Sequence, residues 1–84
     1  MTYTVLVSPR ARRELDELST QLYQRITSKL IDLENDPRPP GCVKLTGREG
    51  WRVRVGDYRI LYSIDDSNRV VLVEHIGHRS DVYR

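Results

Sequence analysis

Cysteine is almost absent from this chain of 84 residues, which contains only Cys42. A single cysteine cannot form an internal disulfide, and no group of Cys and His residues has the spacing of metal ligands. We therefore expect no disulfide, no bound metal and no other cofactor. This cysteine usage suits a reducing compartment such as the cytoplasm.

Long hydrophobic runs are also lacking. No apolar run approaches the ~18 residues of a membrane helix, and the sequence that begins at Met1 does not open like a signal peptide. Internal repeats and low-complexity tracts are absent too. We expect residues 1–84 to form a single soluble, cytoplasmic domain that makes no contact with a membrane.

The sequence has only a small excess of positive charge, with a formal net charge of +2. Its distribution is more informative, because residues 1–42 carry six basic and six acidic side chains whereas residues 43–84 carry eight and six. The second half contains four arginines of interest, Arg52, Arg54, Arg59 and Arg79. Arginine holds a phosphate with a planar fork of donors, so this half is the candidate for contact with nucleic acid.

The first half has the pattern of one strand and two helices. Residues 3–7 are β-branched or aromatic and predict a strand. Ser8 and Pro9 predict the start of one helix, and Ser19 and Thr20 predict the start of a second. The apolar positions with helical spacing are Ala11, Leu15 and Leu18 in the first helix and Leu22, Ile26, Leu30 and Leu33 in the second. With almost no linker between them, the two helices should form an antiparallel hairpin.

The second half changes to a period of two. Residues 38–41 contain Pro and Gly and predict a rigid connector. Strands are predicted at residues 51–55, 58–64 and 69–76, joined by a two-residue turn at Gly56-Asp57 and a turn over residues 65–68. The order of elements predicts an α+β fold: an N-terminal strand, the helical hairpin and a three-stranded antiparallel meander, with the helices on one face of the sheet. The first strand must join an edge of the meander, and the sequence leaves open which one.

The predicted hairpin brings arginines together. A two-residue loop sets Arg54 opposite Arg59, with Arg52 two residues along the same strand, and puts an apolar face on the other side, formed by Trp51, Val53, Val55, Tyr58, Ile60 and Tyr62. Because like charges opposite each other are destabilising, the arginines either bind an anion or are neutralised internally. A register continued into the third strand would bring Glu74 opposite Arg59. A plain solvated outer face remains an equal alternative.

The tail forms a second candidate site. His78, Arg79 and Tyr83 supply a group that titrates near neutrality, a fixed cation and a phenol able to stack on a base or donate a hydrogen bond. The alternative is structural, since a terminal Tyr commonly packs its ring on the domain and a terminal Arg commonly points into water.

Together these segments resemble a known family. Residues 44–47, 51–62 and 76–84, with the pattern basic-x-basic, G-D-Y-R and H-R-x-D-V-Y, are similar to the RelE/ParE toxin superfamily and nearest its RelE branch. The resemblance covers essentially the whole chain. It implies a toxin of a type II toxin–antitoxin pair that cleaves messenger RNA in the ribosomal A site by attack of a 2′-oxygen, without metal. The implied partners are an antitoxin, the ribosome and messenger RNA.

The resemblance also implies roles for particular residues. The family's basic residues fall on Arg52, Arg54, Arg59 and Arg79 and its tail tyrosine on Tyr83. Lysine is common in the family at the first two positions, and arginine cannot readily release a proton. Proton transfer would then fall to His78 or Tyr83, with His75 a weaker candidate because the continued register turns it towards the Trp51 face. Lys44 is a further candidate for contact with RNA phosphate.

Two other functions share this fold. One is a ParE-like toxin that inhibits a topoisomerase, and the other is a catalytically weak RNA-binding remnant. Arg79 together with Tyr83 favours the nuclease, whereas arginine in place of lysine at positions 52 and 54 favours a weak or inactive enzyme.

Overall fold

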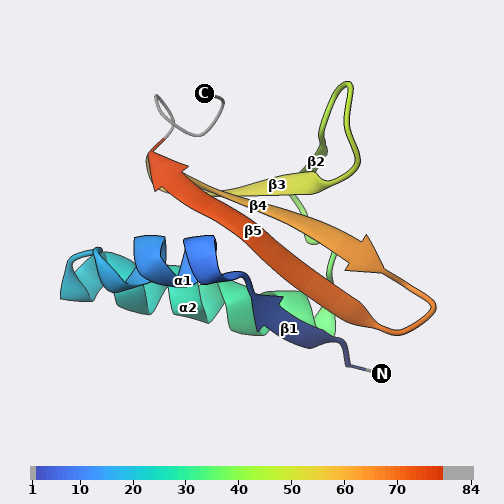
Figure 1. The fold of residues 1–84 in the computed structure, drawn as a ribbon, viewed down its shortest axis with the longest axis horizontal. Coiled ribbons are helices and arrows are strands. Elements are labelled where there is room, and N and C mark those ends of the chain that lie inside the picture. The colour runs from blue at the N-terminus through green and yellow to red at the C-terminus, as the bar shows by residue number, and fades with distance from the viewer. Residues whose placement is uncertain (1, 79–84) are drawn as a thin grey trace.

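The computed structural model describes residues 2–78 and has two helices and five strands in that range (Figure 1). In chain order the elements are β1 (Thr4–Val7), α1 (Pro9–Asp16), α2 (Thr20–Asn35), β2 (Val43–Lys44), β3 (Trp51–Val55), β4 (Tyr58–Asp65) and β5 (Val70–His78). Figure 1 shows both helices on one side of the sheet. This confirms the predicted α+β fold.

Both helices begin at the predicted serines. Oγ of Ser8 accepts a hydrogen bond from the backbone N–H of Ala11 at 3.1 Å, and Oγ of Ser19 accepts one from Leu22 at 3.3 Å. These bonds satisfy N–H groups that have no partner inside the helix. The first turn of α1 also contains Pro9, whose fixed φ suits that position.

The strand order is β1-β5-β4-β3-β2, which settles where the first strand joins. β1 runs parallel to β5, whereas the other neighbours are antiparallel. Two features were not predicted. The two-residue β2 pairs with the start of β3, and β5 continues to His78, two residues beyond the predicted end.

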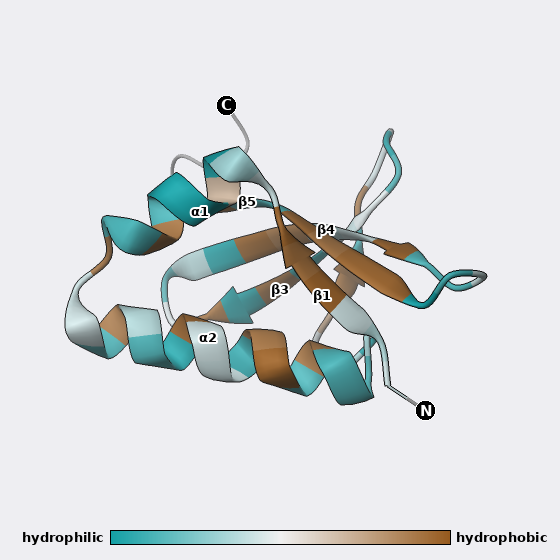
Figure 2. Cartoon of the chain, turned by 60° about the horizontal axis from the view of Figure 1, so that its bottom comes forward, coloured by the Kyte–Doolittle hydropathy of each residue, from teal (hydrophilic) through white to brown (hydrophobic). Residues whose placement is uncertain are grey.

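The core lies between the helices and one face of the sheet (Figure 2). Helix residues packed there are Ala11, Leu15, Ile26, Leu30 and Leu33, and strand residues are Val53, Val55, Ile60, Tyr62, Val71, Val73 and Ile76. Because successive side chains on a strand alternate, the residues that alternate with these positions along β3 and β4 belong to the opposite, open face of the sheet. The arginines of the hairpin are among them.

The connector after α2 is held against the end of the sheet. The hydroxyl of Tyr62 donates a hydrogen bond to the carbonyl oxygen of Pro37 at 2.8 Å, and burial raises the pKa of this phenol well above its usual value. The guanidinium of Arg38 lies 5.2 Å from the ring centroid of Trp51, within range of a cation–π contact. Trp51 is half-buried and packs against the core, so its ring is shared between core and connector. Neither helix in residues 2–78 is long and apolar enough to cross a membrane.

Candidate functional site

The β3–β4 hairpin carries the arginines in the predicted register. Arg54 pairs directly with Arg59, and Arg52 pairs with Leu61 two positions along. The turn between the strands has φ of +60° at Gly56, the first loop position, as a type II′ turn requires. The three arginines therefore share the open face of the sheet, and we call this group the arginine face.

Arg59 is partly enclosed within the arginine face. Arg59 is half-buried, and its Nε and one terminal nitrogen are inaccessible and donate no hydrogen bond to the part of the chain that the structure describes. A buried guanidinium nitrogen without a partner is costly, because it has lost water and gained nothing in exchange. An anion bound at this face would remove that cost.

The predicted neutralisation of Arg59 by Glu74 is wrong. The turn pairs Asp65 with Val70, which moves the register of β4 against β5 by two residues from the predicted one, and a bulge between Leu61 and Tyr62 moves it by one more, so that Gly77 is the residue opposite Arg59. A carboxylate oxygen of Glu74 instead lies 3.9 Å from a guanidinium nitrogen of Arg48. Because glycine has no side chain, the residue of β5 that pairs with Arg59 supplies no counter-charge.

Of the three tail residues predicted to form a site, the structure describes His78. His78 ends β5 and pairs with Tyr58, and the two rings meet edge to face with centroids 5.7 Å apart and an interplanar angle of 84°. Tyr58 and Arg59 are adjacent on β4 and therefore point to opposite sides of the sheet. His78 pairs with Tyr58, so it lies on the helix side of the sheet and not on the arginine face. Arg79 and Tyr83 lie outside the described residues.

Lys44 is not brought to the arginine face. It pairs with Trp51, whereas its neighbour Val43 pairs with Arg52. Paired residues point to the same side of a sheet, so Lys44 lies on the side opposite to Arg52. Lys44 therefore does not join the arginine face, because β2 joins β3 one residue out of the phase that this would need. A contact of Lys44 with RNA phosphate stays a prediction.

A cluster that sequence reasoning missed joins α1 to β5. Nδ1 of His75 lies 2.7 Å from Oε2 of Glu14, and Nε2 lies 3.5 Å from a terminal nitrogen of Arg10. Oε1 of Glu14 accepts a hydrogen bond from the backbone N–H of Ile76 at 2.9 Å. His75 is 8% exposed, as expected for a partnered histidine at the core rim. No local sequence signal links residues 62 positions apart.

The cluster borders a small hollow of about 250 Å³ between α1 and the end of β5. His75, His78, Tyr58 and Glu14 are among the residues that line it. Within residues 2–78 there is no group of three or more His, Cys, Asp or Glu side chains arranged to hold a metal ion.

The chain is similar to known proteins in both sequence and fold. Residues 5–83 match the family described as the ParE toxin of the type II toxin–antitoxin system parDE. Toxin RelG of Mycobacterium tuberculosis is 35% identical, over 100% of this chain and 99% of that protein, and the mRNA interferase toxin RelE of Escherichia coli is 28% identical, over 99% and 92%. The crystal structure of the archaeal RelE–RelB complex from Pyrococcus horikoshii contains a similar chain, with a TM-score of 0.85 and 28% identity over 98% of this chain and 100% of that one.

Proposed function

The chain belongs to the RelE/ParE superfamily of type II toxins, near its RelE branch, and from this premise we propose that it is a ribosome-dependent endoribonuclease that cleaves messenger RNA in the A site. The observation that carries the proposal is the arginine face. Three guanidinium groups share it, and Arg59 has buried nitrogens without a partner among residues 2–78. The name mRNA interferase of the Escherichia coli relative supports the same reaction.

The proposed reaction needs cations at the phosphate. A ribose 2′-oxygen attacks the adjacent phosphorus, a P–O2′ bond forms and the P–O5′ bond breaks, which leaves a 2′,3′-cyclic phosphate and a 5′-hydroxyl. Negative charge accumulates on the phosphoryl oxygens in the transition state. Arg54 and Arg59 are paired by the hairpin before substrate arrives, so they can stabilise that charge without reorganising.

Proton transfer must come from other groups. The 2′-hydroxyl has to lose a proton and the leaving 5′-oxygen has to gain one, and arginine side chains can do neither readily. We assign these transfers to Tyr83, with Arg79 as a further clamp on the phosphate; His78 is the weaker candidate, because its ring packs on Tyr58 on the helix side of the sheet. Tyr83 and Arg79 carry these roles by resemblance to the RelE branch. His78 ends the strand from which that segment continues.

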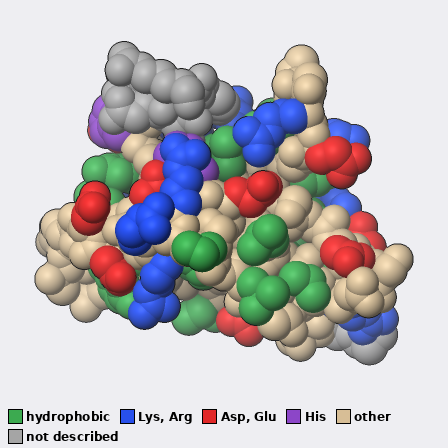
Figure 3. All heavy atoms as spheres, viewed as in Figure 1, with side chains coloured by type: hydrophobic (Ala, Val, Ile, Leu, Met, Phe, Trp, Pro, Cys, Tyr) green, Lys and Arg blue, Asp and Glu red, His purple; other side chains and the backbone are tan. Residues whose placement is uncertain are grey.

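We propose a cognate antitoxin as the partner that switches this activity off. The open face carries Leu6 and Leu72, which are paired across β1 and β5 and are 50% and 37% exposed. Hydrophobic side chains also lie among charged ones on the surface in Figure 3. An amphipathic acidic segment could cover the two leucines and reach the arginines of the same face. The similar Pyrococcus horikoshii chain lies in a RelE–RelB complex, which supports such a partner.

In the decisive experiment, the purified protein is incubated with ribosomes that are programmed with a defined messenger. We expect cleavage within the A-site codon and products that end in a 2′,3′-cyclic phosphate and a 5′-hydroxyl. The alternative, inhibition of a topoisomerase, is favoured by the ParE description of the matching family. Supercoiling assays therefore run beside the ribosome assay, and inhibition of supercoiling with no cleavage would select that alternative.

A further inference from the structure

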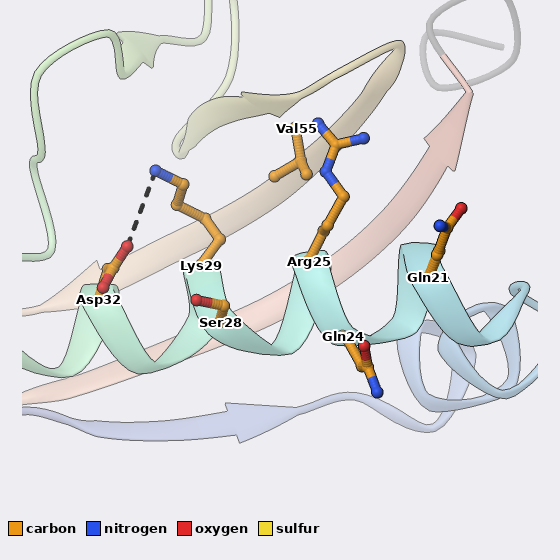
Figure 4. A pocket seen from close by; sticks show the side chains of 7 residues that line it. All are labelled: Gln21, Gln24, Arg25, Ser28, Lys29, Asp32 and Val55. Carbon is orange, nitrogen blue, oxygen red and sulfur yellow. Dashed lines mark ion pairs between the residues drawn. The ribbon is translucent and has the colours of Figure 1, made fainter.

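A groove of about 690 Å³ lies between α2 and the end of β3, on the helix side of the β3–β4 hairpin (Figure 4). Its lining comes from polar side chains of α2 and from Val55. The arginine face lies on the opposite side of the same hairpin, because Arg54 alternates with Val55 along β3. The groove is separate from the residues proposed above for cleavage.

Arg25 is seated against the hairpin turn. Its two terminal nitrogens lie 3.3 and 3.4 Å from the point that a Cβ at position 56 would occupy. Gly56 therefore gives the guanidinium room to lie on the turn backbone, in addition to supplying the positive φ of the turn. Figure 4 shows Arg25 extending from α2 towards Val55.

Arg25 also has no counter-charge among residues 2–78. Within residues 2–78, Arg25 makes no ion pair, whereas Arg10, Arg12, Arg38 and Arg48 each lie within 4.0 Å of a carboxylate. Lys29, one turn further along α2, lies 3.9 Å from Asp32 and is thus partly neutralised. The groove keeps a net positive charge centred on Arg25.

The remaining chemistry of the groove matches a sugar–phosphate backbone. Gln21, Gln24 and Ser28 add amide and hydroxyl groups beside the two cations, and such side chains are those that contact phosphate and sugar oxygens. No aromatic ring is among the lining residues, so the groove offers no platform on which a base could stack. A contact made here would be insensitive to RNA sequence.

We propose that this groove binds the sugar–phosphate backbone of RNA through Arg25. The RNA-binding surface then continues from the arginine face, round the turn at Gly56, onto α2. The inference deepens the proposed function by adding a binding site that takes no part in the cleavage step.

The test compares Arg25→Gln with Arg13→Gln, a matched change of an exposed arginine on α1 that does not line this groove. Affinity for ribosomes with and without messenger, and for a single-stranded RNA of about 16 nucleotides, is measured over a range of salt. We expect Arg25→Gln to weaken binding about tenfold at low salt and to reduce the slope of log affinity against log salt by about 0.7–1. Arg13→Gln should leave both quantities unchanged.

The comparison of empty with programmed ribosomes distinguishes ribosomal RNA from messenger as the ligand of the groove. Equal weakening on empty and programmed ribosomes identifies ribosomal RNA as the ligand, and weakening only on programmed ribosomes identifies the messenger. A slope identical to that of the wild type in every RNA assay would overturn the proposal, and so would a loss of affinity confined to the antitoxin. If the wild type fails to cleave messenger but Arg25→Gln still weakens RNA binding, the proposed nuclease function fails and the groove stands.

Discussion

Arg54 and Arg59 are cross-strand partners beside a two-residue turn, and the residue of β5 that pairs with Arg59 is Gly77. The residues that flank such a turn exchange hydrogen bonds, so the next pair is a non-hydrogen-bonded one, in which side chains come closest. Two like charges are thus held together with no carboxylate opposite them on β5. This relationship sets the first prediction.

Replacing Arg59 or Arg54 by Ala should lower the single-turnover rate of messenger cleavage by about 10²–10³, because each removes a preorganised donor to the phosphate. The free energy of unfolding of the Arg54→Ala variant should stay the same or rise by up to about 1 kcal/mol, since a like-charge pair is relieved. Urea unfolding measures the second quantity. Wild-type cleavage rates in both variants would remove the arginine face from the mechanism.

Proton transfer is tested at Tyr83 and His78. Tyr83→Phe retains the ring and removes the hydroxyl, so a large loss of rate in Phe indicates proton transfer and a loss confined to Ala indicates stacking. His78→Gln should flatten the pH dependence of the rate between about pH 5 and 8 if the imidazole takes part. Full rates and an unchanged pH profile in both Tyr83→Phe and His78→Gln would assign the transfers to other groups.

The acid stability of the fold should depend on Asp66. Its carboxylate accepts hydrogen bonds from Arg38, at 3.2 and 2.9 Å, and from the hydroxyl of Tyr3 at 2.6 Å, and these partners lower its pKa to about 2. The unfolded value is about 3.9. A depressed folded pKa contributes stability above the unfolded value, and this contribution is lost as pH falls from about 4 to about 2.

Unfolding midpoints in urea between pH 5 and 2 measure this loss. Asp66→Asn should give a shallower dependence on pH over that window than the wild type. Arg38→Ala removes the largest cause of the shift and should make the dependence shallower as well. Parallel curves for the three proteins would mean that these contacts do not persist in solution.

Glu14 should matter for stability through Ile76. Its Oε1 accepts the backbone N–H of Ile76, and Ile76 is a buried core residue of β5. Glu14→Ala removes that acceptor and should lower the free energy of unfolding by about 1–3 kcal/mol. Glu14→Gln retains an acceptor and should cost less, and equal losses in the two variants would indicate that the hydrogen bond is unimportant.

Association with the proposed antitoxin should depend on salt. If acidic side chains of the antitoxin approach the arginine face, attraction speeds encounter, and the association rate should fall as ionic strength rises. Stopped-flow measurements at several salt concentrations check this. The Arg54→Ala variant should show a weaker salt dependence than the wild type, and an association rate indifferent to salt would contradict the predicted acidic contact.

The sequence by itself determined the features whose causes are local. Ser8 and Ser19 cap the helices because a side-chain oxygen lies three residues before the N–H that it accepts. The pairing of Arg54 with Arg59 follows from a two-residue turn and strict alternation, both of which are visible within residues 51–62. The fold class followed from the order of these elements, and the resemblance covered the same segments.

Only the tertiary structure decided the contacts between distant segments. The pairing of Asp65 with Val70 at the turn, together with the bulge at Leu61 and Tyr62, makes Gly77, and not Glu74, the neighbour of Arg59, because the register of β4 against β5 depends on the turn that forms and on packing beyond it. The side of the sheet that Lys44 occupies depends on a two-residue strand that has no pattern of its own. Arg25 meets Gly56 because α2 packs across the sheet, and spacing along the chain carries no record of which helix residue will reach a particular turn.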